Sequence, residues 1–381
     1  MAENWKTFTL GDLIEINNQS ISRNLSFDEI EYIDTSSVTE NIFGEVQKFK
    51  IEHAPSRAKR LVANNDIIYS TVRPIQKHYG FISNVKPNTV VSTGFAVLTP
   101  KKIDPKFLYY YLSRAEIVGF LNGVAESNTT TFPAFNASLF EVLEINAPES
   151  IEEQRRIAEI LSALDEKIEL NLHLNATLEK IAQAIFKQWF VDFQFPDFDG
   201  KLVDGLPQGW RKGKLGEVLE LAYGKALKSE NRIAGEYPVI GSSGIVGFHN
   251  EFYVEGAGIV IGRKGTIGEV IWIDENFFPI DTTFFVKDLL GVKNLFFHFY
   301  LLQKQNFKNI SSDSAVPGLN KNEAMRNEVV IPENKVILQF NEIAKSILEK
   351  KSFLKAENQT LTQIRDGLLP KLMSGKIRVS A

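Results

Sequence analysis

The chain contains an internal repeat, and this feature limits its fold more than any other. Residues 4–15, NWKTFTLGDLIE, return at residues 209–220 as GWRKGKLGEVLE, an offset of 205. Residues 132–149 align without a gap onto residues 316–333, and both segments end in Pro-Glu. Self-similarity of this kind is typical of a chain that builds the same structural unit more than once. We therefore predict two similar globular heads.

Two further segments between these blocks also repeat. Residues 64–74 correspond to residues 256–266, and residues 90–98 correspond to residues 279–287. The offset falls from 205 to 184 along the chain, so the connecting loops of the two copies differ in length. We expect the heads to share a framework and to differ in their loops.

Each half ends in a segment with the pattern of a long helix. A helix of 35 residues is about 50 Å long, which favours a helix pair over a helix lying on a globular core. Heptad spacing predicts a first seam of Ile157, Leu161, Leu164, Ile168, Asn171, Asn175, Leu178, Ala182, Ile185 and Trp189. It predicts a second seam of Val336, Phe340, Ile343, Ile347, Lys350, Leu354, Glu357, Leu361, Ile364 and Leu368. Asparagine in a seam fixes register at a cost in stability, a role that we expect for Asn171 and Asn175.

The predicted fold class is α+β, with the order head, helix, head, helix and approximate twofold symmetry. The expected boundaries are 1–150 for the first head, 151–190 for the first helix, 191–209 for a linker, 210–332 for the second head, 333–375 for the second helix and 376–381 for a tail.

Composition excludes several classes of protein. No apolar run reaches the roughly 18 residues of a membrane span, and the N-terminal segment lacks the layout of a signal peptide. The chain has no cysteine, and its five histidines are scattered without metal-ligand spacing. We expect a cytoplasmic chain that binds neither a membrane nor a metal.

The segment GRKGTIG, residues 262–268, is the first candidate for binding phosphate. Its three glycines surround Arg263, Lys264 and Thr266. A nucleotide-binding P-loop requires lysine after the second glycine and a helix next, whereas here lysine precedes that glycine and a strand-like segment follows. The alternative is a structural glycine-rich hairpin joining two strands. We favour a loop that contacts the backbone of a nucleic acid.

The net charge of the chain is −4, but one segment has a local excess of basic residues. Residues 48–77 hold seven basic side chains and two acidic ones, and such a patch steers a polyanion, although a basic run is also typical of a solvated surface. Residues 126–133 and 311–318 are rich in hydroxyl groups. These segments are either loops that contact DNA or ordinary turns. The candidate DNA-binding residues are Arg57, Lys59, Arg60, Arg73, Lys77, Asn128, Thr129, Arg263, Lys264, Thr266, Ser312 and Ser314. The repeat places Arg73 near Arg263 and Lys264.

The linker contains Pro196-Asp197 and Asp199-Gly-Lys201, which is similar to the motif of a metal-dependent nuclease. Such a site needs its carboxylates on adjoining strands around a metal ion, and this spacing is too tight. We predict no catalytic residue in the chain. Two related but different heads instead suit two different half-sites on one DNA duplex, where Arg and Lys reach phosphate or the edge of guanine.

Together these features resemble the DNA-specificity subunit of type I restriction–modification enzymes. The resemblance rests on the repeated W…LG(E/D) start, the GRKGTIG loop, the P-x-(L/F)-N segment ending in Pro-Glu, and the helix EEQRRIAEILSALDEKIELN. The segment FVDFQFP…LPQGW is similar to the family's entry into its second target-recognition domain. The first loop, STVRP, departs from the glycine-rich form.

The resemblance implies two target-recognition domains whose following helices pack antiparallel as a coiled-coil spacer. It implies a bipartite, asymmetric double-stranded DNA target with a gap set by that spacer. It also implies two modification (methyltransferase) subunits and restriction (translocase–nuclease) subunits as partners. S-adenosylmethionine, ATP and Mg would belong to those partners, which methylate adenine N6 or cut DNA, and no cofactor to this chain. A coiled-coil scaffold with two protein-binding heads is the alternative, and an enzyme with its own active site is the third.

Overall fold

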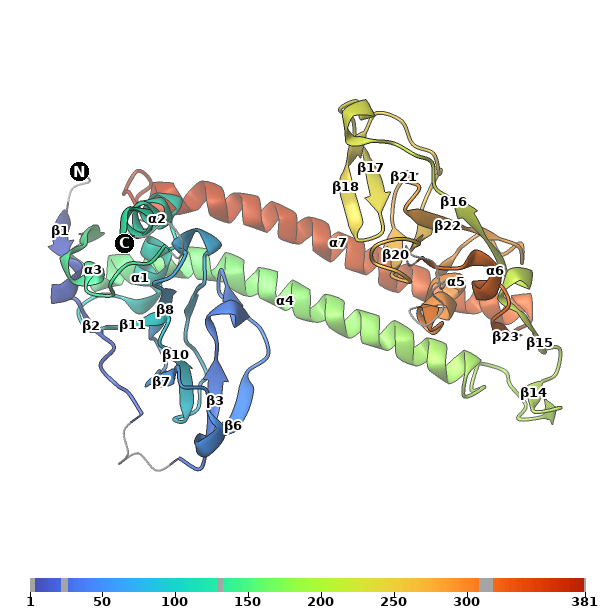
Figure 1. Ribbon diagram of the computed structural model, residues 1–381, viewed down its shortest axis with the longest axis horizontal. Helices are drawn as coiled ribbons and strands as arrows, with labels where there is room; N and C mark the ends of the chain where they lie inside the picture. Colours follow the sequence, from blue (N-terminus) through green and yellow to red (C-terminus); the bar gives the residue numbers. More distant parts are fainter. Residues whose placement is uncertain (1–3, 22–26, 129–132, 308–317, 380–381) are drawn as a thin grey trace. The chain divides into compact units, whose positions relative to one another are not determined.

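The computed structural model describes residues 4–21, 27–128, 133–307 and 318–379 (Figure 1). The chain divides into two compact units, residues 1–170 with 358–381 and residues 171–357. Each unit contains one head and parts of both long helices. No helix in the described ranges is long and apolar enough to cross a membrane.

The described residues of head 1 form two four-stranded sheets, two two-stranded pairs and three α-helices. Its main strands are β1 (Trp5–Thr9), β2 (Ile14–Ile16), β3 (Glu29–Ile33), β6 (Gln47–Lys50), β7 (Ala58–Leu61), β8 (Ile67–Ser70), β9 (Tyr79–Phe81), β10 (Thr89–Ser92), β11 (Phe95–Pro100) and β12 (Glu144–Pro148). A small hairpin, β4 (Val38–Thr39) and β5 (Ile42–Phe43), and the helices α1 (Pro105–Leu112), α2 (Ala115–Asn128) and α3 (Leu139–Val142) complete the head. The sheet orders are β6-β3-β10-β7 and β2-β11-β8-β9, and β1 pairs with β12.

Head 2 repeats this arrangement. Its strands are β15 (Arg211–Lys214), β16 (Leu219–Tyr223), β17 (Tyr237–Gly241), β18 (Gly244–His249), β19 (Gly258–Gly262), β20 (Val270–Ile273), β21 (Phe278–Pro279), β22 (Thr283–Asp288) and β23 (Glu328–Ile331). Its helices are α5 (Phe296–Gln303) and α6 (Lys321–Ala324), and a hairpin of β13 (Leu202–Val203) and β14 (Leu206–Pro207) precedes it. The sheet orders are β16-β22-β19-β20 and β18-β17-β21, and β15 pairs with β23.

Strand pairing confirms the predicted duplication. The order β2-β11-β8-β9 in head 1 matches β16-β22-β19-β20 in head 2, and β6-β3-β10 matches β18-β17-β21. In the second of these matching pairs of sheets, one pair of strands is parallel in each head: β3 with β10 in head 1, and β17 with β21 in head 2. Only head 1 carries a further strand, β7, at this edge among the described residues.

The sequence alignment of residues 90–98 with 279–287 is wrong by one residue. Thr99 of β11 lies opposite Glu15, and its counterpart Lys287 of β22 lies opposite Glu220. The offset between these two strands is therefore 188 instead of 189. A shift of one residue exchanges the two faces of a strand, but the first four residues of both strands are buried. Hydrophobicity could not distinguish the two registers.

The two long helices are α4 (Ile151–Phe190) and α7 (Asn334–Leu372), as the sequence predicts. In the unit of head 1, Arg365 of α7 pairs with Asp165 of α4 at 2.8 Å. In the unit of head 2, Lys351 of α7 pairs with Glu179 of α4. A second contact, Asn358 with Ile168 in the unit of head 1 and Glu357 with Asn171 in the unit of head 2, gives the direction. In each unit the residue number falls along α4 as it rises along α7, so the helices run antiparallel.

The predicted α4 seam is confirmed. Each of its ten residues is buried or half-buried. Asn171 is fully buried, and its amide nitrogen donates a hydrogen bond of 2.6 Å to Glu357 of α7 within the unit of head 2. Its effect on register stays a prediction.

The seam predicted for α7 is wrong at Ile343, Lys350 and Ile364, because these side chains are exposed. The inward-facing line lies one residue later, at Ile337, Ala344, Lys351, Asn358 and Arg365. Its polar members bond to α4: Asn358, for example, donates to the carbonyl of Ile168 at 3.2 Å. Counting apolar residues misses a seam in which polar pairs replace hydrophobic contacts.

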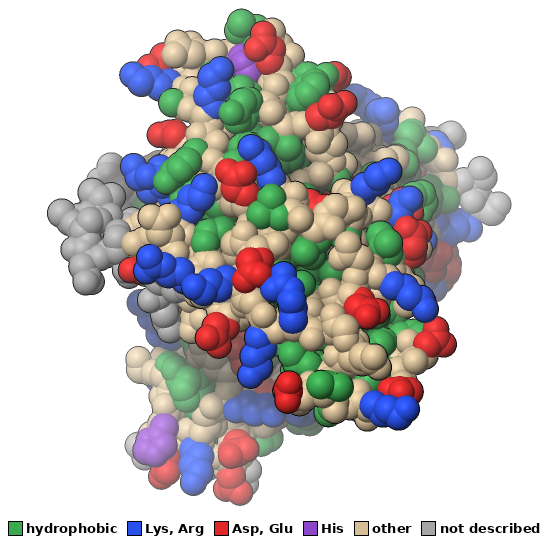
Figure 2. All heavy atoms as spheres, turned by 90° about the vertical axis from the view of Figure 1, so that its right-hand side faces the viewer, with side chains coloured by type: hydrophobic (Ala, Val, Ile, Leu, Met, Phe, Trp, Pro, Cys, Tyr) green, Lys and Arg blue, Asp and Glu red, His purple; other side chains and the backbone are tan. Residues whose placement is uncertain are grey.

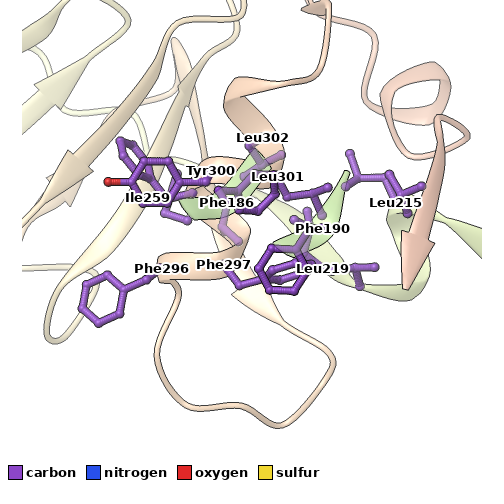
Figure 3. Packing of buried hydrophobic residues seen from close by; sticks show 14 of the residues in the cluster. Phe186, Phe190, Leu215, Leu219, Ile259, Phe296, Phe297, Tyr300, Leu301 and Leu302 are labelled. Atoms are coloured by element: carbon purple, nitrogen blue, oxygen red, sulfur yellow. The ribbon is translucent and has the colours of Figure 1, made fainter. Parts of the chain in front are cut away.

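Each helix is also part of the core of a head. In the unit of head 2, Phe186 and Phe190 of α4 pack on Phe297 of α5, with ring centres 5.9 and 4.9 Å apart (Figure 3). In the unit of head 1, Ile157 and Leu161 of α4 belong to the cluster around α1. Each unit therefore contains a core that includes both a head and a helix.

Candidate nucleic-acid interface

The GRKGTIG segment forms the turn between β19 and β20, whose last pair is Ile261 opposite Val270. The amide of Gly262 donates to the carbonyl of Glu269 at 2.9 Å, and Gly268 donates back to Gly262 at 2.8 Å. A Cβ atom on Gly262 would lie 1.9 Å from the carbonyl oxygen of Thr266. Glycine is therefore required for the closure of this hairpin.

Other segments of head 2 hold the backbone of Arg263. Its amide donates to the carbonyl of Thr282 at 2.9 Å, and its carbonyl accepts from Leu319 at 2.9 Å. Leu319 belongs to the P-x-(L/F)-N segment, whose Asn320 accepts hydrogen bonds from the first amides of α6. The repeated motif thus has a structural role, because it fastens this loop to the head.

The side chains of the loop face different surroundings. The guanidinium of Arg263 donates through Nη1 to the carbonyl of Asp281 at 3.2 Å and lies 5.0 Å from the ring centre of Tyr223. Lys264 and Thr266 are exposed. All three predicted residues are therefore presented together on one turn.

Sequence reasoning missed two members of this cluster, Tyr223 and Lys321. Tyr223 ends β16 and is 51% exposed. The amine of Lys321 lies 5.5 Å from the Tyr223 ring centre and 3.8 Å from a carboxylate oxygen of Glu220. These residues are about 40 and 58 positions from Arg263 in the sequence. The pairing of β16 with β22 places Tyr223 beside Phe284 and close to Arg263, and the bond from the amide of Leu319 to the carbonyl of Arg263 brings Lys321 near. Neither contact leaves a local pattern in the sequence.

In head 1 the position of Arg263 is taken by Thr71. Its amide donates to the carbonyl of Gly94 at 2.9 Å, and its carbonyl accepts from Phe135 at 3.0 Å. These two bonds are the counterparts of those made by Arg263. Arg73 therefore lies two positions beyond the equivalent of Arg263, in a loop of different shape.

The predicted residues Arg73, Lys77 and Asn128 lie in neighbouring segments of head 1. Arg73 and Lys77 have left-handed backbones, with φ of 47° and 56°, a conformation that is uncommon for side chains other than glycine, asparagine and aspartate. Lys77 forms an ion pair with Glu40. The amide nitrogen of Asn128 donates to Ala134 at 3.3 Å, and Ala134 bridges to Val72, next to Arg73.

The three basic residues near β7 differ in accessibility. Arg57 and Lys59 are exposed. Arg60 is half-buried, and its Nη1 atom is enclosed without a hydrogen-bond partner in the described part of the chain. Burial also lowers the pKa of Arg60. Arg60 is therefore a poorer candidate for a phosphate contact than its two neighbours.

The remaining candidates, Thr129, Ser312 and Ser314, lie outside the described residues. In the linker, Asp199 and Lys201 pair with each other at 3.3 Å on the surface. Within the described ranges, no three His, Asp or Glu side chains are grouped so that they could hold a metal ion.

On the face shown in Figure 2, Lys and Arg side chains are scattered among Asp and Glu side chains. No large field of one sign covers this face. On this face, basic side chains therefore gather only in small local groups.

Comparison with known proteins agrees with this geometry. Residues 2–180 and 207–362 match the family described as type I restriction modification DNA specificity domain. The type I restriction enzyme HindI specificity subunit of Haemophilus influenzae is 28% identical, covering 98% of this chain and 99% of that protein. The MjaIX specificity subunit of Methanocaldococcus jannaschii is 26% identical, covering 84% of this chain and 79% of its own length.

Among solved structures, the type I restriction–modification S subunit from M. genitalium has the same fold. The TM-score is 0.66 at 21% identity, with 97% of this chain and 96% of that chain covered. The duplicated heads and long helices define a two-domain specificity protein. The chain belongs to the type I restriction–modification DNA specificity family.

Proposed function

We propose that this chain reads a bipartite, asymmetric DNA target, with each head recognising one half-site. The observation that carries the proposal is a repeated framework with different side chains at equivalent loop positions, Arg263 in head 2 and Thr71 in head 1. Two heads of equal framework and unequal loops suit a target whose halves differ in sequence. Phosphate contacts would fix the position of each head, and base-edge contacts would supply specificity.

We further propose that the chain acts without an active site or cofactor of its own. Two modification subunits would methylate adenine, and restriction subunits would translocate and cut DNA, using S-adenosylmethionine, ATP and Mg. The lengths of α4 and α7 would set the gap between half-sites, and the complex would work in the cytoplasm. The names of the relatives as specificity subunits of type I restriction enzymes support these assignments.

The test is a double substitution in the exposed turn of head 2. Arg263→Ala with Lys264→Ala removes two positive charges while leaving the glycines that close the hairpin. If both side chains meet phosphate, the slope of log affinity against log salt falls by up to about 2. The target sequence is first identified by mapping methylated sites. Affinity for duplex DNA of that sequence is then measured by titration at several salt concentrations.

The scaffold alternative makes the opposite prediction. Binding to modification subunits would then depend on the heads, and affinity for duplex DNA would be unchanged by the double substitution. An unchanged salt slope together with an unchanged methylation pattern would contradict DNA recognition by this loop. Circular dichroism and binding of the modification subunits serve as controls for folding.

A further inference from the structure

Groups from separate segments of head 2 hold the Arg263 guanidinium in one place. The bond from Nη1 to Asp281 uses one corner of the group. Its carbon lies 5.0 Å from the ring centre of Tyr223 and 5.7 Å from that of Phe284. Tyr223 is itself fixed edge-on against Phe284, with ring centres 4.9 Å apart. A guanidinium held in this way loses little conformational freedom when it binds.

The edge formed by Nε and Nη2 carries no bond to any described residue. This edge presents two parallel donors in a fixed plane. Its geometry matches the O6 and N7 acceptors of guanine in the major groove, the commonest specific contact of arginine with DNA.

Lys264 is held in a different way, although it is the next residue. Its backbone amide is bonded to Thr282 at 3.1 Å, but its exposed amine makes no ion pair or hydrogen bond with the described residues. A lysine amine on a flexible stem is a point charge without a preferred plane. It suits a phosphate better than a base edge.

We propose that Arg263 reads a base of the half-site of head 2, that Tyr223 is its positioning residue, and that Lys264 contacts phosphate. The proposal rests on the DNA recognition proposed above. It assigns base recognition and phosphate contact to two neighbouring residues of one turn. Tyr223 is half-exposed at the end of β16, where it contacts Arg263 and Lys321. Head 1 has Asn18 and Thr71 at the two positions equivalent to Tyr223 and Arg263. The contact between a tyrosine ring and an arginine at these positions is therefore specific to head 2.

The experiment uses the full chain assembled with its modification subunits. Methylation mapping first defines the target, and duplexes then carry each single-base change in the half-site of head 2, alongside a random duplex. Arg263→Lys keeps the charge and removes the planar fork. We expect it to lower discrimination at one base pair by roughly 10-fold to 100-fold and to leave random-duplex binding nearly unchanged.

Lys264→Ala is expected to weaken target and random duplexes by the same factor and to reduce the salt slope by about 1. Tyr223→Asn introduces the residue that head 1 carries at this position, and because Tyr223 is half-exposed, we expect the fold to be kept. We expect Tyr223→Asn to lower discrimination at the same base pair as Arg263→Lys, and Tyr223→Phe to behave as the unchanged protein. Phe252→Leu removes another exposed ring of head 2 and serves as the matched control.

Any one of three results would overturn the proposal. If Arg263→Lys keeps the base preference, or if Arg263→Ala weakens all duplexes equally, Arg263 contacts phosphate. If Tyr223→Asn retains full discrimination, Tyr223 does not position the arginine. Failure of the proposed function is distinguishable, because the unchanged complex would then show no preference for any duplex.

Discussion

The two heads have the same strand order, yet the corresponding turns present different chemistry. In head 2 the turn after β19 contains Gly265 and Gly268, Gly262 ends the strand itself, and Arg263 lies against an aromatic ring. In head 1 the turn after β8 contains no glycine before residue 80, and two of its residues, Arg73 and Lys77, adopt left-handed backbones. Since Arg263 and Thr71 are fastened by equivalent backbone bonds, the framework fixes where the residue at this position lies but not which residue it is.

The largest effect is expected from exchanging one head. Replacing residues 210–332 by the matching segment of a relative should change every recognised base in one half of the target and none in the other. The physical reason is that each head has its own core and its own loops. Methylation mapping of the chimera provides the measurement. Altered bases in both halves would show that the heads do not read independently.

The next effect concerns a buried amide that occurs in both heads. Asn341 of α7 accepts from the amide of Phe297 at the start of α5 and donates to Asn294, both at 2.9 Å. Gln154 of α4 accepts from Asp104 at the start of α1 at 2.9 Å and donates to Pro148 at 2.7 Å. Each amide ties the first turns of a long helix to the helix of its head.

Asn341→Leu and Gln154→Leu each leave buried backbone groups without a partner. We expect a loss of about 1–3 kcal/mol in unfolding free energy for each variant. Hydrogen exchange should locate the loss in head 2 for Asn341 and in head 1 for Gln154. Gln359→Leu, an exposed amide on α7, is the control. If either variant increased hydrogen exchange equally in both heads, the two amides would not stabilise the two heads separately.

A smaller effect is expected from the ion pairs between the long helices. In the unit of head 1, α4 supplies the acid Asp165 and α7 the base Arg365. In the unit of head 2, α4 again supplies the acid, Glu179, and α7 the base, Lys351. The charges therefore distinguish the two helices.

Breaking one pair tests this arrangement. Asp165→Arg places two cations together and should cost about 1 kcal/mol or more, because the pair is only a quarter to a third exposed. Adding Arg365→Asp restores opposite charges and should recover much of the loss in a double-mutant cycle. The readout is the urea-dependent unfolding free energy. Additive losses would mean that the pair contributes nothing specific.

Some features of this structure leave a local pattern in the sequence, and others do not. The repeat, the two long helices and the glycine-rich hairpin were predictable because each leaves a local pattern. The α7 seam was wrong at Ile343, Lys350 and Ile364, because Lys351 and Arg365 occupy inward positions that hydrophobicity does not mark. The Tyr223–Arg263 contact was not predictable, because it arises only when β16 pairs with β22.

The last effect concerns an acid at a position where head 1 has none. Asp288 ends β22 and accepts from His298 of α5 at 3.1 Å, with further bonds from the amides of Leu290 at 2.8 Å and Val292 at 2.7 Å. Burial raises its pKa, but the hydrogen bonds from His298 and the two amides outweigh burial and lower the pKa of Asp288 to about 2. The equivalent last residue of β11 in head 1 is Pro100.

A folded-state pKa below that of the unfolded chain means that ionised Asp288 stabilises head 2. This contribution is fully present above the unfolded pKa of about 4 and is lost as pH falls towards 2. Asp288→Asn should therefore be less stable than the unchanged chain at pH 5, with the gap narrowing towards pH 2. Asp204→Asn, an exposed acid, should show no such gap. Hydrogen exchange should place the difference in head 2 alone, and parallel pH curves for Asp288→Asn and the unchanged chain would contradict the assignment.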